Sequence, residues 1–185
     1  MRQFALSSKK LRNIPRRKRA LARWAAGFNG RYIPAQQPDE CFFNWKIPVH
    51  LHLLQGKQTT PDLQAFCMQQ LIQAAQHLIA AAQPSEQYYR VACLIVWPYL
   101  HQSEVTIFYD PEYYQGFLNT PTPLPRSLLL EQLALDIPED WQVVGVDVTQ
   151  PDDPQSVIWW VIGQPVISAN HLPNPLANHA VCPNP

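Results

Sequence analysis

Two groups of side chains are spaced for chemistry: a cluster of cations near the N-terminus and a pair of histidines. Guanidinium groups bind phosphate and carboxylate oxygens in a forked geometry, and several of them close together would neutralise several phosphates. The cluster consists of Arg12, Arg16, Arg17, Lys18, Arg19 and Arg23. It predicts contact with an anionic partner, either nucleic acid or an acidic protein. A solubilising tail, or a tail folded onto the chain's own acidic surface, is the alternative without a partner.

The distribution of charge along the chain favours the partner interpretation. Residues 1–31 contain ten of the fourteen Lys and Arg residues and no Asp or Glu. The rest of the chain contains all fourteen acidic residues and four basic ones, so the net charge of zero conceals a basic arm and an acidic body. Such asymmetry is typical of an arm that meets something anionic. Its binding to nucleic acid would depend steeply on salt and little on base sequence.

His50 and His52 would lie on the same face of an extended strand. Zinc needs three or four ligands, so the pair alone is not a site, and Cys93, Glu104 or Asp147 could complete it only if the sheet brings them near. Two strand histidines that only form hydrogen bonds are the more common arrangement. We therefore predict no catalytic residue, metal or cofactor, and keep the two histidines as weak candidates for a metal site.

Size and composition indicate one globular domain outside the membrane. The chain has 185 residues, of which 46% are hydrophobic and 15% charged, enough to bury a core without disulfides. The four cysteines are widely separated, and the longest apolar stretch, 91–97, is too short to cross a bilayer. The N-terminus lacks the apolar segment of a secretory signal. These features predict a cytoplasmic protein with reduced thiols.

The elements follow from hydrophobic periodicity and from helix caps. We expect helices over 15–28, 61–82, 111–117 and 128–135, and strands over 47–54, 89–97, 104–109, 141–149 and 156–162. Short connections between successive strands imply antiparallel pairing. The predicted fold class is α+β: an antiparallel sheet of about five strands, one long helix across a face, and an N-terminal basic helix.

The arm divides at the start of its helix. Residues 1–14 are expected to be a flexible basic arm, 15–163 a single α+β domain, and 164–185 a Pro-rich disordered tail. On the first helix one apolar stripe should dock on the body, and three arginines should point away from it. The stripe is Leu21, Trp24, Ala25 and Phe28, and the arginines are Arg16, Arg19 and Arg23.

Several of these features together resemble a bacterial family known only as a domain of unknown function. They are the acid-free basic arm, Trp45 through His50-Leu51-His52-Leu53, the helix with Cys67, Leu71-Ile72 and Ala74-Ala75, Tyr89-Arg90-Val91, and Ile107-Phe108. The resemblance covers roughly 9–163. It implies a bacterial cytosolic protein and transfers no catalytic residue, because no activity is attached to the family.

Three functions from different classes follow. The first is a non-catalytic binding protein whose basic arm engages an anionic partner, for example an immunity-like or antitoxin-like inhibitor. The second is a small metal-dependent hydrolase centred on the His50/His52 strand. The third is an accessory subunit whose arm threads into a larger assembly. Nucleophile-elbow, zincin and dinucleotide-binding patterns are missing from the sequence, which favours the first.

Overall fold

The computed structural model describes residues 14–28, 33–48, 60–82, 90–97, 100–119, 123–124, 126, 133–148 and 157–166. Its elements are α1 (Ile14–Ala26), β1 (Phe42–Lys46), α2 (Pro61–Ala82), β2 (Arg90–Trp97), the 3-10 turn η3 (Leu100–Gln102), β3 (Glu104–Phe108), α3 (Pro111–Leu118), β4 (Pro123–Leu124), β5 (Gln142–Val148) and β6 (Val157–Gly163). Most of the proposed flexible arm and Pro-rich tail lies outside the described residues.

The strands form one open sheet in the order β1-β3-β2-β6-β5-β4, and every neighbouring pair is antiparallel. The two predicted hairpins, β2 with β3 and β5 with β6, are confirmed, and β2 pairs with β6 to join them. The α+β class is therefore confirmed. The described sheet has six strands where about five were expected, because the short strands β1 and β4 extend its two edges.

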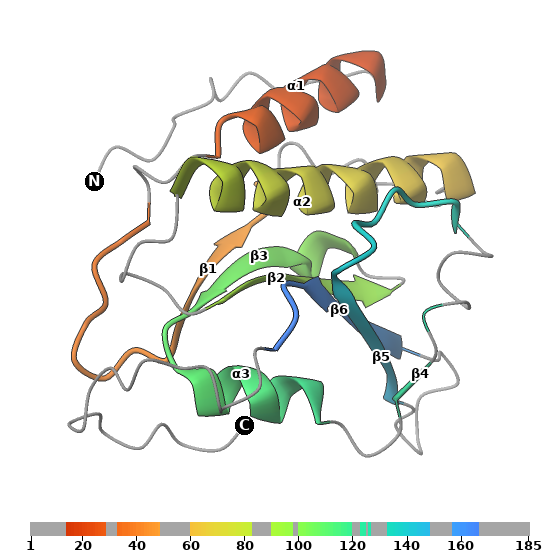
Figure 1. Cartoon of the computed structure of the whole chain (residues 1–185). Coiled ribbons are helices and arrows are strands. Elements are labelled where there is room, and N and C mark those ends of the chain that lie inside the picture. Colours follow the sequence, from red (N-terminus) through yellow and green to blue (C-terminus); the bar gives the residue numbers. More distant parts are fainter. Residues whose placement is uncertain are drawn as a thin grey trace.

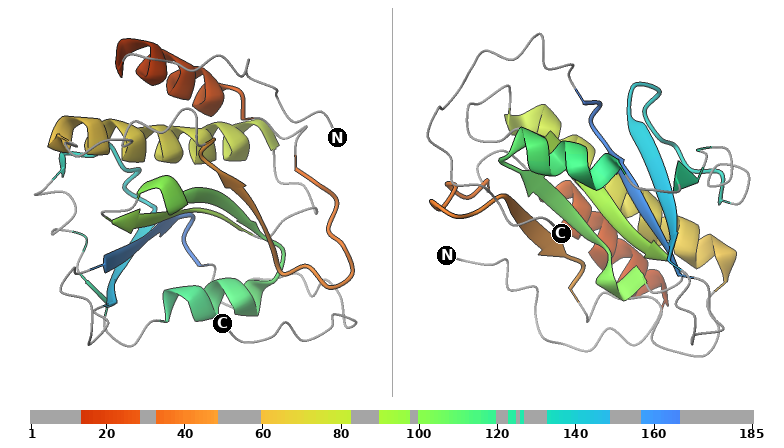
Figure 2. Two further views of the ribbon diagram at one scale, coloured as in Figure 1. Left: turned by 180° about the vertical axis from the view of Figure 1, so that it is seen from behind. Right: turned by 90° about the horizontal axis from the view of Figure 1, so that it is seen from below.

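The molecule is layered, as Figure 1 and the reverse and lower views of Figure 2 show. The long helix α2 crosses one face of the sheet, α3 lies against the opposite face, and α1 lies outside α2. The sequence predicted the helix across the sheet and the docked N-terminal helix. α2 is covered on both sides, and this explains why several of its glutamines are sheltered: Gln64 and Gln70 are only 8% and 5% exposed.

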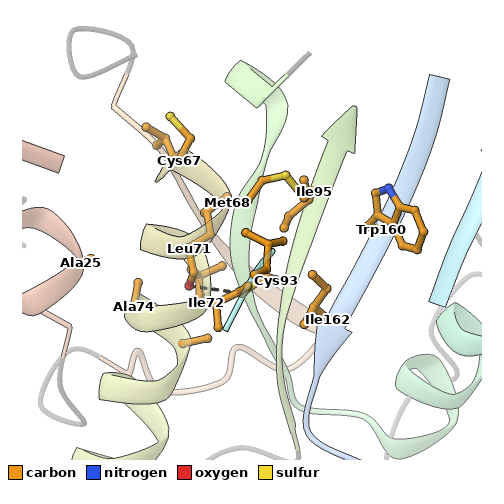
Figure 3. Close-up of a cluster of buried hydrophobic side chains, with 14 of the residues drawn as sticks. Ala25, Cys67, Met68, Leu71, Ile72, Ala74, Cys93, Ile95, Trp160 and Ile162 are labelled. Atoms are coloured by element: carbon orange, nitrogen blue, oxygen red, sulfur yellow. Dashed lines mark hydrogen bonds between the residues drawn. The ribbon is translucent and has the colours of Figure 1, made fainter. Parts of the chain in front are cut away.

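The main core fills the space between α2 and the sheet (Figure 3). Met68, Leu71 and Ile72 of α2 face Cys93 and Ile95 of β2, and all five are buried. Strand β2 is buried on both faces over six consecutive residues, as its continuous apolar run predicts for a central strand. The thiol of Cys93 donates a hydrogen bond to the carbonyl oxygen of Leu71, at 3.2 Å.

A smaller core lies between the sheet and α3. It is built on Phe108 and Tyr114, which are 2% and 0% exposed, and on the alternate residues of β2 and β6. The helix begins as predicted: the Asp110 side chain caps it by accepting a hydrogen bond from the backbone N–H of Tyr113, at 2.7 Å, and Pro111 follows in the first turn.

The prediction for residues 42–54 was wrong where the structure describes them. Residues 42–46, which precede the expected strand 47–54, form β1, whereas Ile47 and Pro48 follow β1 and are not part of a strand. Aromatic residues fit a pleated surface well, and Phe43 and Trp45 take this role beside β3. The rest of the expected strand, including His50 and His52, and most of the helix expected over 128–135 lie outside the described residues.

Candidate anion-binding face of the first helix

The first helix is attached to the body by one apolar side. Ala20, Leu21 and Ala25 of α1 are 2%, 0% and 1% exposed and belong to the main core. Trp24 and Phe28 are half-buried and pack against that core. The predicted docking stripe is therefore confirmed, with Ala20 as an additional member.

Aromatic contacts connect this helix to the edge of the sheet. The rings of Trp24 and Phe28 meet edge to face with their centroids 4.8 Å apart, and Phe28 meets Trp45 of β1 in the same way at 5.3 Å. Phe43 continues the row, 5.0 Å from Trp45. Edge-to-face pairs of this kind add to the stability that burial provides. They fix α1 in two directions, on α2 and on β1.

The six predicted cationic residues do not act alike. Arg16, Arg19 and Arg23 are exposed, and their spacing of three and four residues places them on one side of α1, away from the docking stripe. We call these three residues the arginine stripe. Arg17 and Lys18 are half-buried, and Lys18 Nζ lies 4.8 Å from the centre of the Phe66 ring on α2. Arg12 lies outside the described residues.

The electrostatics of α1 are uniform in sign. The helix contains no Asp or Glu, so no carboxylate on the same helix neutralises the arginine stripe. Arg16 lies in the first turn, where the helix dipole is positive and a cation is unfavourable, and Arg23 lies in the last turn, where a cation is favourable. The charge of Arg16 therefore does not stabilise the N-terminal end of the helix.

The residues proposed to complete a histidine site do not converge. Cys93 pairs with Val105 and faces α2, whereas Glu104 pairs with Leu94, which belongs to the core on the opposite face. Asp147 is on β5, two strands away from β2. Burial raises the pKa of the Cys93 thiol far above its ordinary value, which makes it a poor ligand or nucleophile. Among the described residues, no three His, Cys, Asp or Glu side chains are grouped to hold a metal ion.

A buried polar cluster on β1 and β3 was not predicted from the sequence. Asn44 Nδ2 donates a hydrogen bond to Glu104 Oε1 at 2.7 Å, and Thr106 lies beside them. Glu104 and Thr106 are 6% and 4% exposed. The signal in the sequence was the pattern Glu-Val-Thr-Ile-Phe, in which polar and apolar residues alternate. The burial of its polar residues could not be inferred without knowing that β1 pairs with the edge of β3 that faces away from β2.

The cysteines have different states. Cys41, directly before β1, is disulfide-bonded, while Cys67 and Cys93 are buried and form no disulfide. Cys182 lies outside the described residues. A disulfide is unusual in a reducing compartment, so the expectation of reduced thiols is wrong for Cys41.

The fold and this surface define an α+β protein with an open antiparallel sheet and an externally docked basic helix. The chain belongs to the family described as "Protein of unknown function (DUF3916)", which matches residues 22–164. The predicted family resemblance is confirmed. The match begins inside α1, so of the arginine stripe only Arg23 lies within it.

No curated protein and no solved structure matches the chain. Within the described part of the chain, no helix has the length and apolar character needed to span a membrane.

Proposed function

We propose that this chain is a non-catalytic binding protein, and that the arginine stripe of α1 engages an anionic partner. The observation that carries the proposal is the division of α1 into two sides. One side is buried on α2, and the other presents Arg16, Arg19 and Arg23 to solvent. A helix held in this way presents its guanidinium groups on a fixed support, which lowers the entropic cost of binding.

The cost of placing cations at the N-terminal end of α1 supports the same proposal. Arg16 opposes the helix dipole, and the first turn contains no acidic residue. The helix itself therefore gains nothing from a cation at this position, which supports a role of Arg16 in binding. Lys18, by contrast, contributes to the attachment of α1, because it covers the Phe66 ring.

Nucleic acid is the partner that we place first, and an acidic protein second. Three guanidinium groups without neighbouring carboxylates on the helix suit phosphate oxygens. An inhibitor of the immunity or antitoxin type would be the protein version. The proposal includes a bacterial, cytoplasmic location. The disulfide at Cys41 argues against the cytoplasmic location and has no bearing on the binding role. The arginine stripe lies mostly outside the family match, so the proposal concerns this chain and not the whole family.

The metal-dependent hydrolase is not advanced further. His50 and His52 lie outside the described residues, and Cys93 and Glu104 face opposite sides of the sheet. No observation in the described part of the chain favours this function.

The test replaces Arg16, Arg19 and Arg23 together with Gln and measures binding to a generic double-stranded oligonucleotide at several salt concentrations. Loss of three phosphate contacts should reduce the slope of log affinity against log salt by about three. Lys46→Gln is the control, because it removes an exposed cation from the sheet edge and should leave the slope unchanged. Retention on polyglutamate but not on the oligonucleotide would select the acidic-protein partner. Equal binding of wild type and triple variant to both polyanions would contradict the proposal.

A further inference from the structure

A polar cluster occupies one face of the sheet at the edge opposite β4. It consists of Asn44 and Lys46 of β1 and Glu104 and Thr106 of β3. Asn44 pairs directly with Thr106, and Lys46 pairs directly with Glu104, so the four side chains form two adjacent rungs on one face. Edge strand β1 thus contributes half of the cluster, and β3 the other half.

The cluster has too few hydrogen-bond donors. Asn44 Nδ2 donates to Glu104 Oε1, but three buried oxygens, Glu104 Oε2, Asn44 Oδ1 and Thr106 Oγ1, have no hydrogen-bond partner in the described structure. The amide oxygen of Asn44 can only accept hydrogen bonds. The carboxyl oxygen of Glu104 can likewise only accept as long as the group is ionised. Lys46 Nζ lies 4.0 Å from Glu104 Oε2, beyond hydrogen-bond distance, and its side chain is 70% exposed. Lys46 therefore offers a screened charge and no direct bond.

A buried carboxylate oxygen without a hydrogen bond is costly, and protonation removes this cost. A proton on Glu104 Oε2 would neutralise the buried charge and would also give the cluster a donor that it lacks. The bond from Asn44 to Oε1 is compatible with this state, because Oε1 remains an acceptor.

We infer that folding favours the neutral carboxylic acid form of Glu104, and that ionisation of Glu104 loosens edge strand β1 from β3. Burial raises the pKa of Glu104, and the positive charge of Lys46 lowers it in part. The residue of β2 that pairs with Glu104 is Leu94, which carries no charge. On α3 the titratable groups packed on this face are Tyr113 and Tyr114, around Phe108 at the other end of β3.

The direction of the pH effect follows from the raised pKa. The unfolded chain loses the Glu104 proton at a lower pH than the folded chain does. The contribution of Glu104 to stability is therefore complete at acidic pH, below the unfolded pKa, and is lost as pH rises through the folded pKa. β1 responds first because it is an edge strand, paired with β3 and with no other described strand.

The test compares wild type with Glu104→Gln, whose amide has the shape of the neutral acid. An infrared pH titration of wild type should show a protonated carboxyl band that persists to higher pH than that of an ordinary glutamate, and the variant should lack this band. Amide exchange should show β1 protection falling in wild type over the pH range in which this band disappears, and staying level in the variant. Glu139→Gln, at an exposed turn residue, is the control and should change neither result.

A second variant keeps the inference testable if Glu104→Gln folds poorly. Lys46→Gln removes the charge that favours the ionised form, so the carboxyl band should persist to higher pH than in wild type. The inference is wrong if Glu104→Gln removes no protonated carboxyl band that persists above the pH range in which an ordinary glutamate ionises. It is also wrong if β1 protection falls with pH equally in wild type and in Glu104→Gln. Neither result depends on the arginine stripe.

Discussion

At the scale of single residues, Tyr109 ties the segment before β1 to the end of β3. Its hydroxyl donates a hydrogen bond to the carbonyl oxygen of Pro34 at 2.9 Å, and its backbone N–H donates to the carbonyl of Cys41 at the same distance. Burial, and then the negative charge of Glu40, raise the pKa of Tyr109 to about 12. The phenol is therefore held neutral well above the pH at which a free tyrosine ionises.

This shift predicts a loss of stability at alkaline pH. In the unfolded chain Tyr109 would ionise near pH 10, whereas in the folded chain it stays neutral to about pH 12. The free energy of unfolding should therefore fall as pH rises above about 10. Tyr109→Phe should lose about 1 kcal/mol at neutral pH, from the missing hydrogen bond, and should show a weaker alkaline decline. Urea unfolding at several pH values measures both, and an equally steep decline in the variant would contradict the assignment.

At the scale of elements, the pairing of β5 with β6 depends on a glycine. Gly145 lies opposite Trp160, and a Cβ atom at Gly145 would come within 2.6 Å of the indole ring. Trp160 is 2% exposed and part of the main core, so its ring has little freedom to move. Close packing of an aromatic ring over a strand glycine therefore fixes how these two strands meet.

Two glycine substitutions should have opposite effects. Gly145→Ala should destabilise the fold by about 1–3 kcal/mol, because it forces the Trp160 ring out of its place. Gly116→Ala in α3 meets no atom within 4 Å and should stabilise by up to about 1 kcal/mol, since alanine favours the helix. Urea unfolding of both variants gives the comparison. Equal losses in the two would show that backbone freedom, and not the ring contact, decides the result at Gly145.

The elements also show what the sequence could predict. α2, the two hairpins and the Asp110 cap depend on local periodicity and on side-chain capping, and the sequence contains both. β1 was missed because its pairing with β3 is a long-range contact. The arginine stripe followed from helical spacing alone. The contact of Lys18 with the Phe66 ring could not be predicted in this way, because it depends on how α1 crosses α2 and on where Phe66 lies. The Glu104 cluster was missed for the same reason as β1.

At the scale of the whole molecule, α1 is the outermost layer, and its principal packing is against α2 (Figures 1 and 2). Its first turn has no favourable charge, so its stability comes from docking. A layer that is attached by one side is expected to open without unfolding the sheet beneath it. If the arginine stripe binds a partner, that partner would stabilise the docked state by mass action.

Amide hydrogen exchange measured on two core variants tests whether α1 opens separately. Ile95→Val, at a fully buried position of β2, should lower the opening free energy of β2 amides by about 0.5–1.5 kcal/mol and leave α1 amides unchanged. Leu21→Ala should lower the opening free energy of α1 by about 2–5 kcal/mol, because Leu21 is fully buried and its contacts are lost in any opening of α1. An equal fall of α1 and β2 protection in Ile95→Val would mean that α1 opens only when the whole domain unfolds. In that case the basic helix would be a fixed part of the core and not a separable binding layer.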